Sequence, residues 1–128
     1  MKTFTTTNGA QCILLNYGKK PIYSTQICYI EGEGNYSTIK CRNEGAIFSS
    51  FTLKMFSQHL LKENNFFCPR KGLIINLNEL KGIIIKDGSK YVLMNDNSQH
   101  PISRRKGRSL IEFIGESKQW QVEVRNIA

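Results

Sequence analysis

A dense group of cations near the C-terminal end is the part of the chain best suited to chemistry. Four positive side chains fall within five positions directly after Ser103: Arg104, Arg105, Lys106 and Arg108. Ser103 is a good N-cap because its hydroxyl accepts a hydrogen bond from a backbone N–H of the first helical turn. Cations are unfavourable at a helix N-terminus, where free N–H groups already carry positive partial charge. This placement predicts an anionic ligand, and phosphate is favoured because Arg forks and free N–H groups bind it together; a solvated basic turn is the alternative.

A helix is expected to carry these cations. Leu110, Ile111 and Ile114 recur at helical spacing, which predicts a helix over residues 104–114. Pro101, before the cap, favours an extended chain on its N-terminal side. The cationic first turn should therefore follow directly on a short strand.

The composition is that of one globular domain with a large positive excess. The chain has 128 residues, a net charge of +8 and 40% hydrophobic residues, and its mean hydropathy is −0.35. That charge favours a polyanionic partner such as DNA, RNA or an anionic membrane surface. No apolar stretch approaches the roughly 20 residues that a membrane span needs, and the Thr-rich start lacks the apolar segment of a signal peptide. We therefore expect a cytoplasmic protein with no membrane partner.

The four cysteines, Cys12, Cys28, Cys41 and Cys68, are widely spaced. They form no Cys-x-x-Cys pair, and the two histidines are not placed to complete a zinc site. In a chain without a leader, this pattern predicts reduced, largely buried thiols rather than a disulfide framework. We expect no metal and no cofactor, and nothing in the sequence supports a redox-sensing pair.

Alternating and β-branched segments predict a mainly β chain with one or two short helices. Asp87-Gly88 is the clearest hairpin turn, and residues 52–62 carry apolar side chains at helical spacing. The expected strands are residues 11–16, 21–25, 26–31, 36–41, 46–49, 73–75, 81–86, 91–94 and 99–103. The chain divides into a flexible N-terminal arm (1–10), one binding domain (11–114) and a C-terminal extension (115–128) whose alternation predicts an added strand.

Four motifs occur in a fixed order along the chain. They are the strand with Asn-Tyr at residues 29–36, a short helix at 53–61, the segment at 66–77, and Pro101-Ile102-Ser103-Arg104-Arg105. The third motif is similar to the pattern Phe-x-Arg-x-His-Arg-Ser-x-x-Val-Asn, and the fourth is similar to Pro-Val-Ser-Arg-Arg. Both patterns are found in one known protein family. With these motifs, over roughly residues 12–114, the chain resembles the LytTR DNA-binding domain of bacterial transcription regulators.

The resemblance implies an elongated, mostly antiparallel β fold of small sheets that binds double-stranded DNA. Loops at strand ends would enter successive major grooves, often at paired direct repeats. Carried over by position, the implied contacts are Tyr36, Ser37 and Thr38, then Arg70, Lys71 and Gly72, then Ser103, Arg104 and Arg105. Arg105 is our first choice for a base-edge contact, because an Arg fork matches guanine O6 and N7. Arg104, Lys106 and Arg108 would mostly meet phosphates, and Lys71 suits either role.

The chain departs from the family pattern in two respects. Arg70 stands where the family usually has His, and Cys68 where Arg is common, so the usual base preference of that loop does not carry over. Family members usually carry an N-terminal receiver or membrane sensor, whereas fewer than a dozen residues precede the first expected strand here. If the chain is complete, control would come through a homodimer on DNA, abundance, a regulatory protein partner, or not at all.

Two other classes of function stay open. A basic β module for RNA or single strands would stack bases on exposed aromatic rings. Tyr36 and Phe66 are the candidates, although we expect the Phe66-Phe67 pair to pack inside the domain. A protein-interaction domain would use its charge only for solubility. An enzyme is not expected, because the sequence offers no paired carboxylates, nucleophile–base arrangement, phosphate-binding glycine loop or metal cluster.

Overall fold

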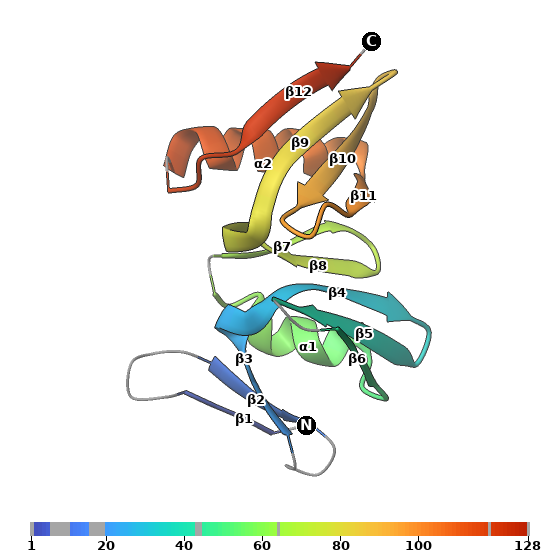
Figure 1. Cartoon of the computed structure of the whole chain (residues 1–128), viewed down its shortest axis with the longest axis vertical. Coiled ribbons are helices and arrows are strands. Elements are labelled where there is room, and N and C mark those ends of the chain that lie inside the picture. Colours follow the sequence, from blue (N-terminus) through green and yellow to red (C-terminus); the bar gives the residue numbers. More distant parts are fainter. Residues whose placement is uncertain are drawn as a thin grey trace.

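The structure is a computed structural model that describes residues 2–5, 11–15, 20–42, 45–63, 65–117 and 119–127. The described residues form three β-sheets stacked along the long axis of an elongated molecule (Figure 1). The first sheet, at the bottom of Figure 1, has the strand order β1-β2-β3, with antiparallel neighbours. Its strands are β1 (Lys2–Thr5), β2 (Gln11–Leu15) and β3 (Lys20–Tyr23).

The second sheet lies in the middle of the molecule and has the strand order β6-β5-β4-β8-β7. Its strands are β4 (Ile27–Glu33), β5 (Tyr36–Cys41), β6 (Ala46–Ser49), β7 (Phe66–Arg70) and β8 (Leu73–Asn76). All of its strand pairs are antiparallel. β8 is buried along its whole length, as the apolar run Leu73-Ile74-Ile75 predicts for a strand covered on both faces.

The third sheet, at the top of Figure 1, has the strand order β11-β10-β9-β12. Its strands are β9 (Leu80–Lys86), β10 (Ser89–Met94), β11 (Gln99–Ile102) and β12 (Glu123–Ile127). Asp87 and Gly88 join β9 to β10 with φ angles of 51° and 82°, the left-handed values that a two-residue hairpin requires. The C-terminal extension contains β12, which pairs in parallel with β9. Before it, the indole N–H of Trp120 donates a 2.6 Å hydrogen bond to Asn78 Oδ1.

Two α-helices are present in the described part of the chain, α1 (Leu53–Leu60) and α2 (Arg104–Ser117). α1 lies between the first two sheets, and α2 lies against the third sheet (Figure 1). Each begins with a side-chain cap, and that of α2, Ser103, was predicted from the sequence. Thr52 Oγ1 accepts a hydrogen bond from the Met55 N–H, and Ser103 Oγ accepts one from the Lys106 N–H. Single 3-10 turns, η1 (Ser24–Gln26) and η2 (Leu77–Glu79), lead into β4 and β9.

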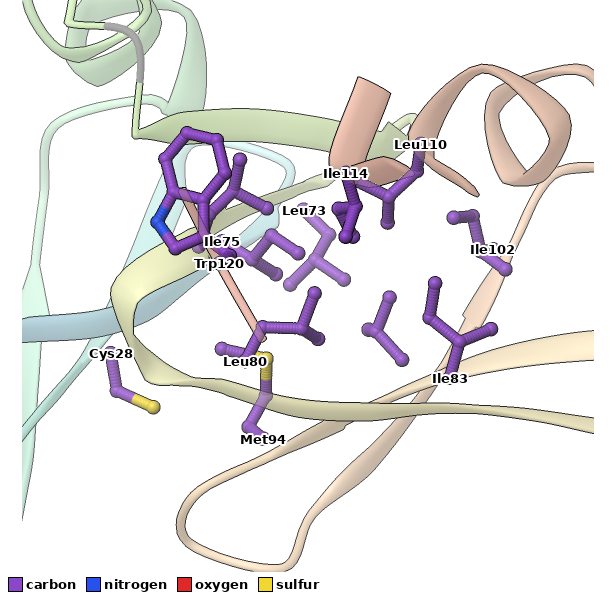
Figure 2. Close-up of a cluster of buried hydrophobic side chains, with 12 residues drawn as sticks. Cys28, Leu73, Ile75, Leu80, Ile83, Met94, Ile102, Leu110, Ile114 and Trp120 are labelled. Carbon is purple, nitrogen blue, oxygen red and sulfur yellow. The ribbon is translucent and has the colours of Figure 1, made fainter. Parts of the chain in front are cut away.

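Two hydrophobic cores lie on opposite faces of the second sheet. The lower core faces the first sheet and includes Phe56 and Leu60 of α1 together with Ile74 of β8. The upper core lies between the second sheet, the third sheet and α2, and it includes Leu73 and Ile75 of β8. Figure 2 shows the upper core, which is completed mainly by Leu80, Ile83, Met94, Ile102, Leu110, Ile114 and Trp120.

The mainly β fold class predicted from the sequence is confirmed, but β1 and β7 were not among the expected strands, and several elements end at other residues than expected. Residues 2–5, expected within a flexible arm, form β1 and pair with β2; residues 6–10 of that arm lie outside the described residues. β4 continues to Glu33, so Gly34 and Asn35 alone form its turn. α2 continues past Ile114 to Ser117, because a glycine such as Gly115 costs a helix only about 1 kcal/mol.

Candidate nucleic-acid interface

Three connections lie along one side of the molecule, at the right of Figure 1: the β4–β5 hairpin, the β7–β8 turn and the β11–α2 junction. We call this side the loop edge. Backbone hydrogen bonds join its three parts. The Gly32 N–H donates to the Gly72 carbonyl over 2.9 Å, and the Ser103 N–H donates to the Pro69 carbonyl over 3.0 Å. The three segments that the resemblance singled out are therefore brought together.

The β4–β5 hairpin presents one of its three predicted contact residues fully to solvent. Tyr36 is 68% exposed at the start of β5. Ser37 is only 1% exposed, and its hydroxyl donates a 2.8 Å hydrogen bond to the Phe51 carbonyl. Thr38 is half-buried. Ser37 thus supports the hairpin from inside, whereas Tyr36 is available to a ligand.

The β7–β8 turn carries an exposed Lys71 and a half-buried Arg70. Gly72 has a φ of +91°, a value that glycine adopts without the strain of a side chain. Arg70 Nη1 donates a 3.1 Å hydrogen bond to the Lys71 carbonyl, and Nη2 lies 3.6 Å from Glu31 Oε2. Arg70 Nε is buried and has no hydrogen-bond partner among the described residues. The turn therefore holds one cation in a fixed position beside a freely exposed one.

Glu31 and His100 belong to this site although the sequence did not single them out. His100 Nδ1 lies 3.9 Å from Glu31 Oε1, and its Nε2 lies 2.8 Å from the Ser98 hydroxyl. The His100 ring also packs on Tyr29, with ring centroids 4.5 Å apart. Burial lowers the pKa of His100, although the Glu31 and Asp96 carboxylates oppose that shift. These partners come from distant segments, so no local sequence pattern could have revealed the cluster.

The predicted basic segment, residues 104–108, lies on the first turns of α2. Arg104, Arg105, Lys106 and Arg108 are all exposed, as is the Ser103 cap. Arg104, Arg105 and Arg108 line one shallow hollow of about 330 Å³ with Ser109 and Glu112. Three guanidinium groups against the one carboxylate of Glu112 leave the hollow with a net positive charge, which suits a phosphate backbone.

Gly107 is the inward-facing member of this segment. A Cβ on Gly107 would lie 2.8 Å from Lys90 Cδ, so the glycine allows the Lys90 side chain to lie against α2. Lys90 and Arg104 line a further hollow of about 270 Å³ beside the β9–β10 turn. On the other flank, Lys106 Nζ lies 5.8 Å from the centroid of the Phe67 ring, within cation–π range. Lys90 is thus an additional cation at this site, which the sequence hides because it comes from β10.

Of the two candidate stacking residues, Tyr36 is exposed, and Phe66 is buried as expected. Phe66 is only 6% exposed and packs in the lower core, so it offers no stacking surface. Phe48 of β6 is 79% exposed and pairs with Thr38 of β5. Because side chains alternate along a strand, Phe48, Thr38 and Tyr36 share one face of the second sheet.

The four cysteines are packed within the fold rather than presented to solvent as reactive groups. Cys12, Cys28 and Cys41 are buried, and Cys68 is half-buried. Burial raises the pKa of the Cys28 thiol to about 12, so the thiol stays protonated near neutral pH. No group of three or more metal-ligating side chains occurs within the described ranges, and no helix there is long and apolar enough to cross a membrane.

A family model for the LytTr DNA-binding domain matches residues 19–115. The chain belongs to this family. The match begins before β3 and extends into α2, so it includes all three parts of the loop edge. Membership implies DNA binding in transcription regulation, and the LytTr domain family is not a family of enzymes.

A solved structure shares the fold of this LytTr domain. It is the LytTr DNA-binding domain of a putative methyl-accepting/DNA response regulator from Bacillus cereus. The two are 19% identical with a TM-score of 0.63, and the alignment covers 89% of this chain and 95% of that one. The comparison with curated proteins finds no match.

Proposed function

We propose that this LytTr domain binds double-stranded DNA sequence-specifically, as a bacterial transcription regulator, with the loop edge entering successive major grooves. The observation that carries the proposal is the joining of the β4–β5 hairpin, the β7–β8 turn and the β11–α2 junction by backbone hydrogen bonds. Two of these segments carry exposed cations, and the third carries exposed Tyr36. A rigid row of such loops suits a duplex, where phosphate contacts set the register and base edges supply specificity.

Each contact residue has a role that follows from its chemistry. Arg105 suits a base edge because its fork matches guanine O6 and N7. Arg104 and Arg108 share its hollow and suit the flanking phosphates, and Lys106, fixed over Phe67, suits a phosphate on the β7 side. Lys71 is exposed on its turn and serves either role.

The proposal includes the arrangement of the DNA sites, the oligomeric state on DNA and the cellular compartment. The positively charged chain repels its own copies in free solution. A duplex neutralises that charge, so a homodimer would assemble on two direct repeats of DNA in the cytoplasm. A regulatory protein partner would act on surfaces away from the loop edge.

Selection from a random pool tests this function. The protein is incubated with random duplexes, and the bound DNA is recovered and sequenced over several rounds. A recurring motif, as two direct repeats separated by whole helical turns, is the expected result. Recovery of DNA without any motif would leave a polyanion binder and contradict sequence-specific binding.

Exposed aromatic rings favour a second candidate, binding of RNA or single-stranded DNA. Tyr36 and Phe48 share one face of the second sheet, and base–ring stacking contributes about 1–3 kcal/mol per base. Under this alternative, an oligonucleotide would bind more tightly as a single strand than as any duplex. Replacing both rings by alanine would then abolish that preference. Loss of binding to every nucleic acid at moderate salt would instead indicate a protein-interaction domain.

A further inference from the structure

Glu31 lies at the centre of the loop edge and contacts two of its basic side chains. Its Oε2 lies 3.6 Å from Arg70 Nη2, and its Oε1 lies 3.9 Å from His100 Nδ1. β4 and β7 belong to the second sheet and β11 belongs to the third. One carboxylate therefore joins two sheets at the place where their loops meet. We call Glu31, Arg70 and His100 the bracket.

The bracket limits what Arg70 can offer to a ligand. Nη1 donates to the Lys71 carbonyl, Nη2 faces Glu31, and Nε is buried without a hydrogen-bond partner among the described residues. A guanidinium carries two N–H groups on each terminal nitrogen and one on Nε. The 3.6 Å separation from Glu31 is an ion-pair contact rather than a hydrogen bond, so one N–H of Nη1 and both N–H groups of Nη2 have no hydrogen-bond acceptor among the described residues. One N–H from each terminal nitrogen can therefore still form the fork that fits guanine O6 and N7.

The other contacts of the bracket keep it from moving. His100 is fixed by the 2.8 Å contact between its Nε2 and the Ser98 hydroxyl and by the Tyr29 ring. The turn that carries Arg70 is fixed by the 2.9 Å hydrogen bond from the Gly32 N–H to the Gly72 carbonyl. The Glu31 carboxylate therefore lies between a His100 ring that is held in place and an Arg70 side chain whose turn is held in place.

We propose that Glu31 is a positioning residue that holds Arg70 for contact with a base edge rather than with a phosphate. This inference rests on the proposed sequence-specific binding of DNA. A freely moving arginine would meet the nearest phosphate, and such a contact carries no sequence information. A carboxylate beside the guanidinium repels phosphates and fixes the fork. The Glu31 carboxylate therefore lowers the affinity for every duplex but raises the ratio of the affinity for the correct sequence to that for other sequences.

The test compares Glu31→Gln with Glu33→Gln. Both variants remove one negative charge from β4, but Glu33 is exposed at the end of the strand and lies outside the bracket. Affinity is measured for the duplex recovered by selection and for a shuffled duplex of equal length, at one salt concentration. We expect Glu33→Gln to tighten both complexes equally. Glu31→Gln should tighten the shuffled complex but lower the ratio of selected to shuffled affinity about tenfold, within the range that one bidentate base contact supplies.

Two further variants show whether the effect passes through Arg70. With Arg70→Ala already present, Glu31→Gln should leave the affinity ratio unchanged, because no guanidinium remains to be positioned. Glu31→Asp keeps the charge on a shorter side chain and should restore part of the ratio. If Glu31→Gln changes both affinities by the same factor as Glu33→Gln, Glu31 contributes only charge and the proposal is overturned.

An NMR titration of His100 tests the bracket without DNA. Because the Glu31 carboxylate raises the pKa of His100, Glu31→Gln should lower that pKa, and Glu33→Gln should shift it less. An unchanged pKa in Glu31→Gln would show that the bracket does not form and would overturn the proposal. If selection returns no motif while the His100 pKa responds, the bracket stands, but sequence-specific binding fails and base positioning fails with it.

Discussion

The backbone N–H of Ser103 donates a 3.0 Å hydrogen bond to the carbonyl oxygen of Pro69. Ser103 caps the basic helix α2, and Pro69 precedes Arg70 in β7. This bond fixes the separation of two cationic segments that are far apart in the sequence. A surface that is ordered before it meets DNA loses less conformational entropy on binding, so the loop edge should bind a duplex with little rearrangement.

Arg105→Ala should weaken binding to the selected duplex by about 1–3 kcal/mol and relax the base preference at one position, because it removes a bidentate base contact. The measurement is fluorescence anisotropy with the selected and the shuffled duplex at the same salt concentration. Lys62→Ala is the matched control. Lys62 is an exposed cation at the far end of β7 from Arg70, so its loss should affect both duplexes weakly and alike. Equal losses on both duplexes with Arg105→Ala would contradict the base contact.

Binding should depend steeply on salt. If the complex neutralises about six phosphates, affinity should fall by roughly a thousandfold between about 50 and 200 mM monovalent salt. A series of anisotropy titrations gives the slope of log K against log salt. Arg108→Ala should reduce that slope by about one unit, as expected for a lost phosphate contact. An affinity that hardly changes with salt would argue against a phosphate-binding surface.

Gly32→Ala should destabilise the fold without removing any charge. A Cβ on Gly32 would lie 2.8 Å from Leu53 Cβ, and Leu53 begins α1, so the helix would have to move. Overpacking of this kind typically costs about 1–3 kcal/mol, which urea unfolding would detect. Gly115→Ala is the control, and it should raise the stability rather than lower it. Apart from the adjacent residues and the backbone of α2 itself, no atom lies within 4 Å of the added Cβ there, and replacing a helical glycine should stabilise α2 by up to about 1 kcal/mol.

Stability should fall as the pH drops below 6.5, the ordinary pKa of histidine. Burial lowers the pKa of folded His100, with Arg70 acting in the same direction and Glu31 and Asp96 opposing it. The unfolded chain therefore binds more protons in this range, and the free energy of unfolding decreases with decreasing pH. Urea unfolding between about pH 7.5 and 5.5 measures the effect. His100→Gln should flatten the curve, and an unchanged pH dependence in that variant would contradict the assignment to His100.

Local sequence patterns predicted most of the elements because each of those patterns has a local physical cause. Asp87-Gly88 forms its expected hairpin since both residues tolerate positive φ. Ser103 caps α2 since its hydroxyl lies within reach of the Lys106 N–H. The alternation of β5 already placed Ser37 on the same face as buried Ile39, and the hydroxyl of Ser37 is indeed turned inward.

The rest of the candidate site could not be predicted, because it depends on contacts between distant segments. Glu31, Arg70 and His100 come from strands β4, β7 and β11, and their meeting requires two sheets to be stacked. Lys90 joins the basic surface only because Gly107 leaves room for it. The strand at residues 2–5 was missed for a related reason. Its Thr-rich sequence carries no buried pattern, and its order comes from pairing with β2.

The burial of β8 on both faces also determines how the molecule should come apart. Leu73 and Ile75 belong to the upper core and Ile74 belongs to the lower core. The same strand therefore contributes buried side chains to both cores. Neither core can open without exposing apolar side chains of the other. The two halves of the molecule should therefore unfold as one cooperative unit, with near-UV and far-UV circular dichroism changing at the same temperature.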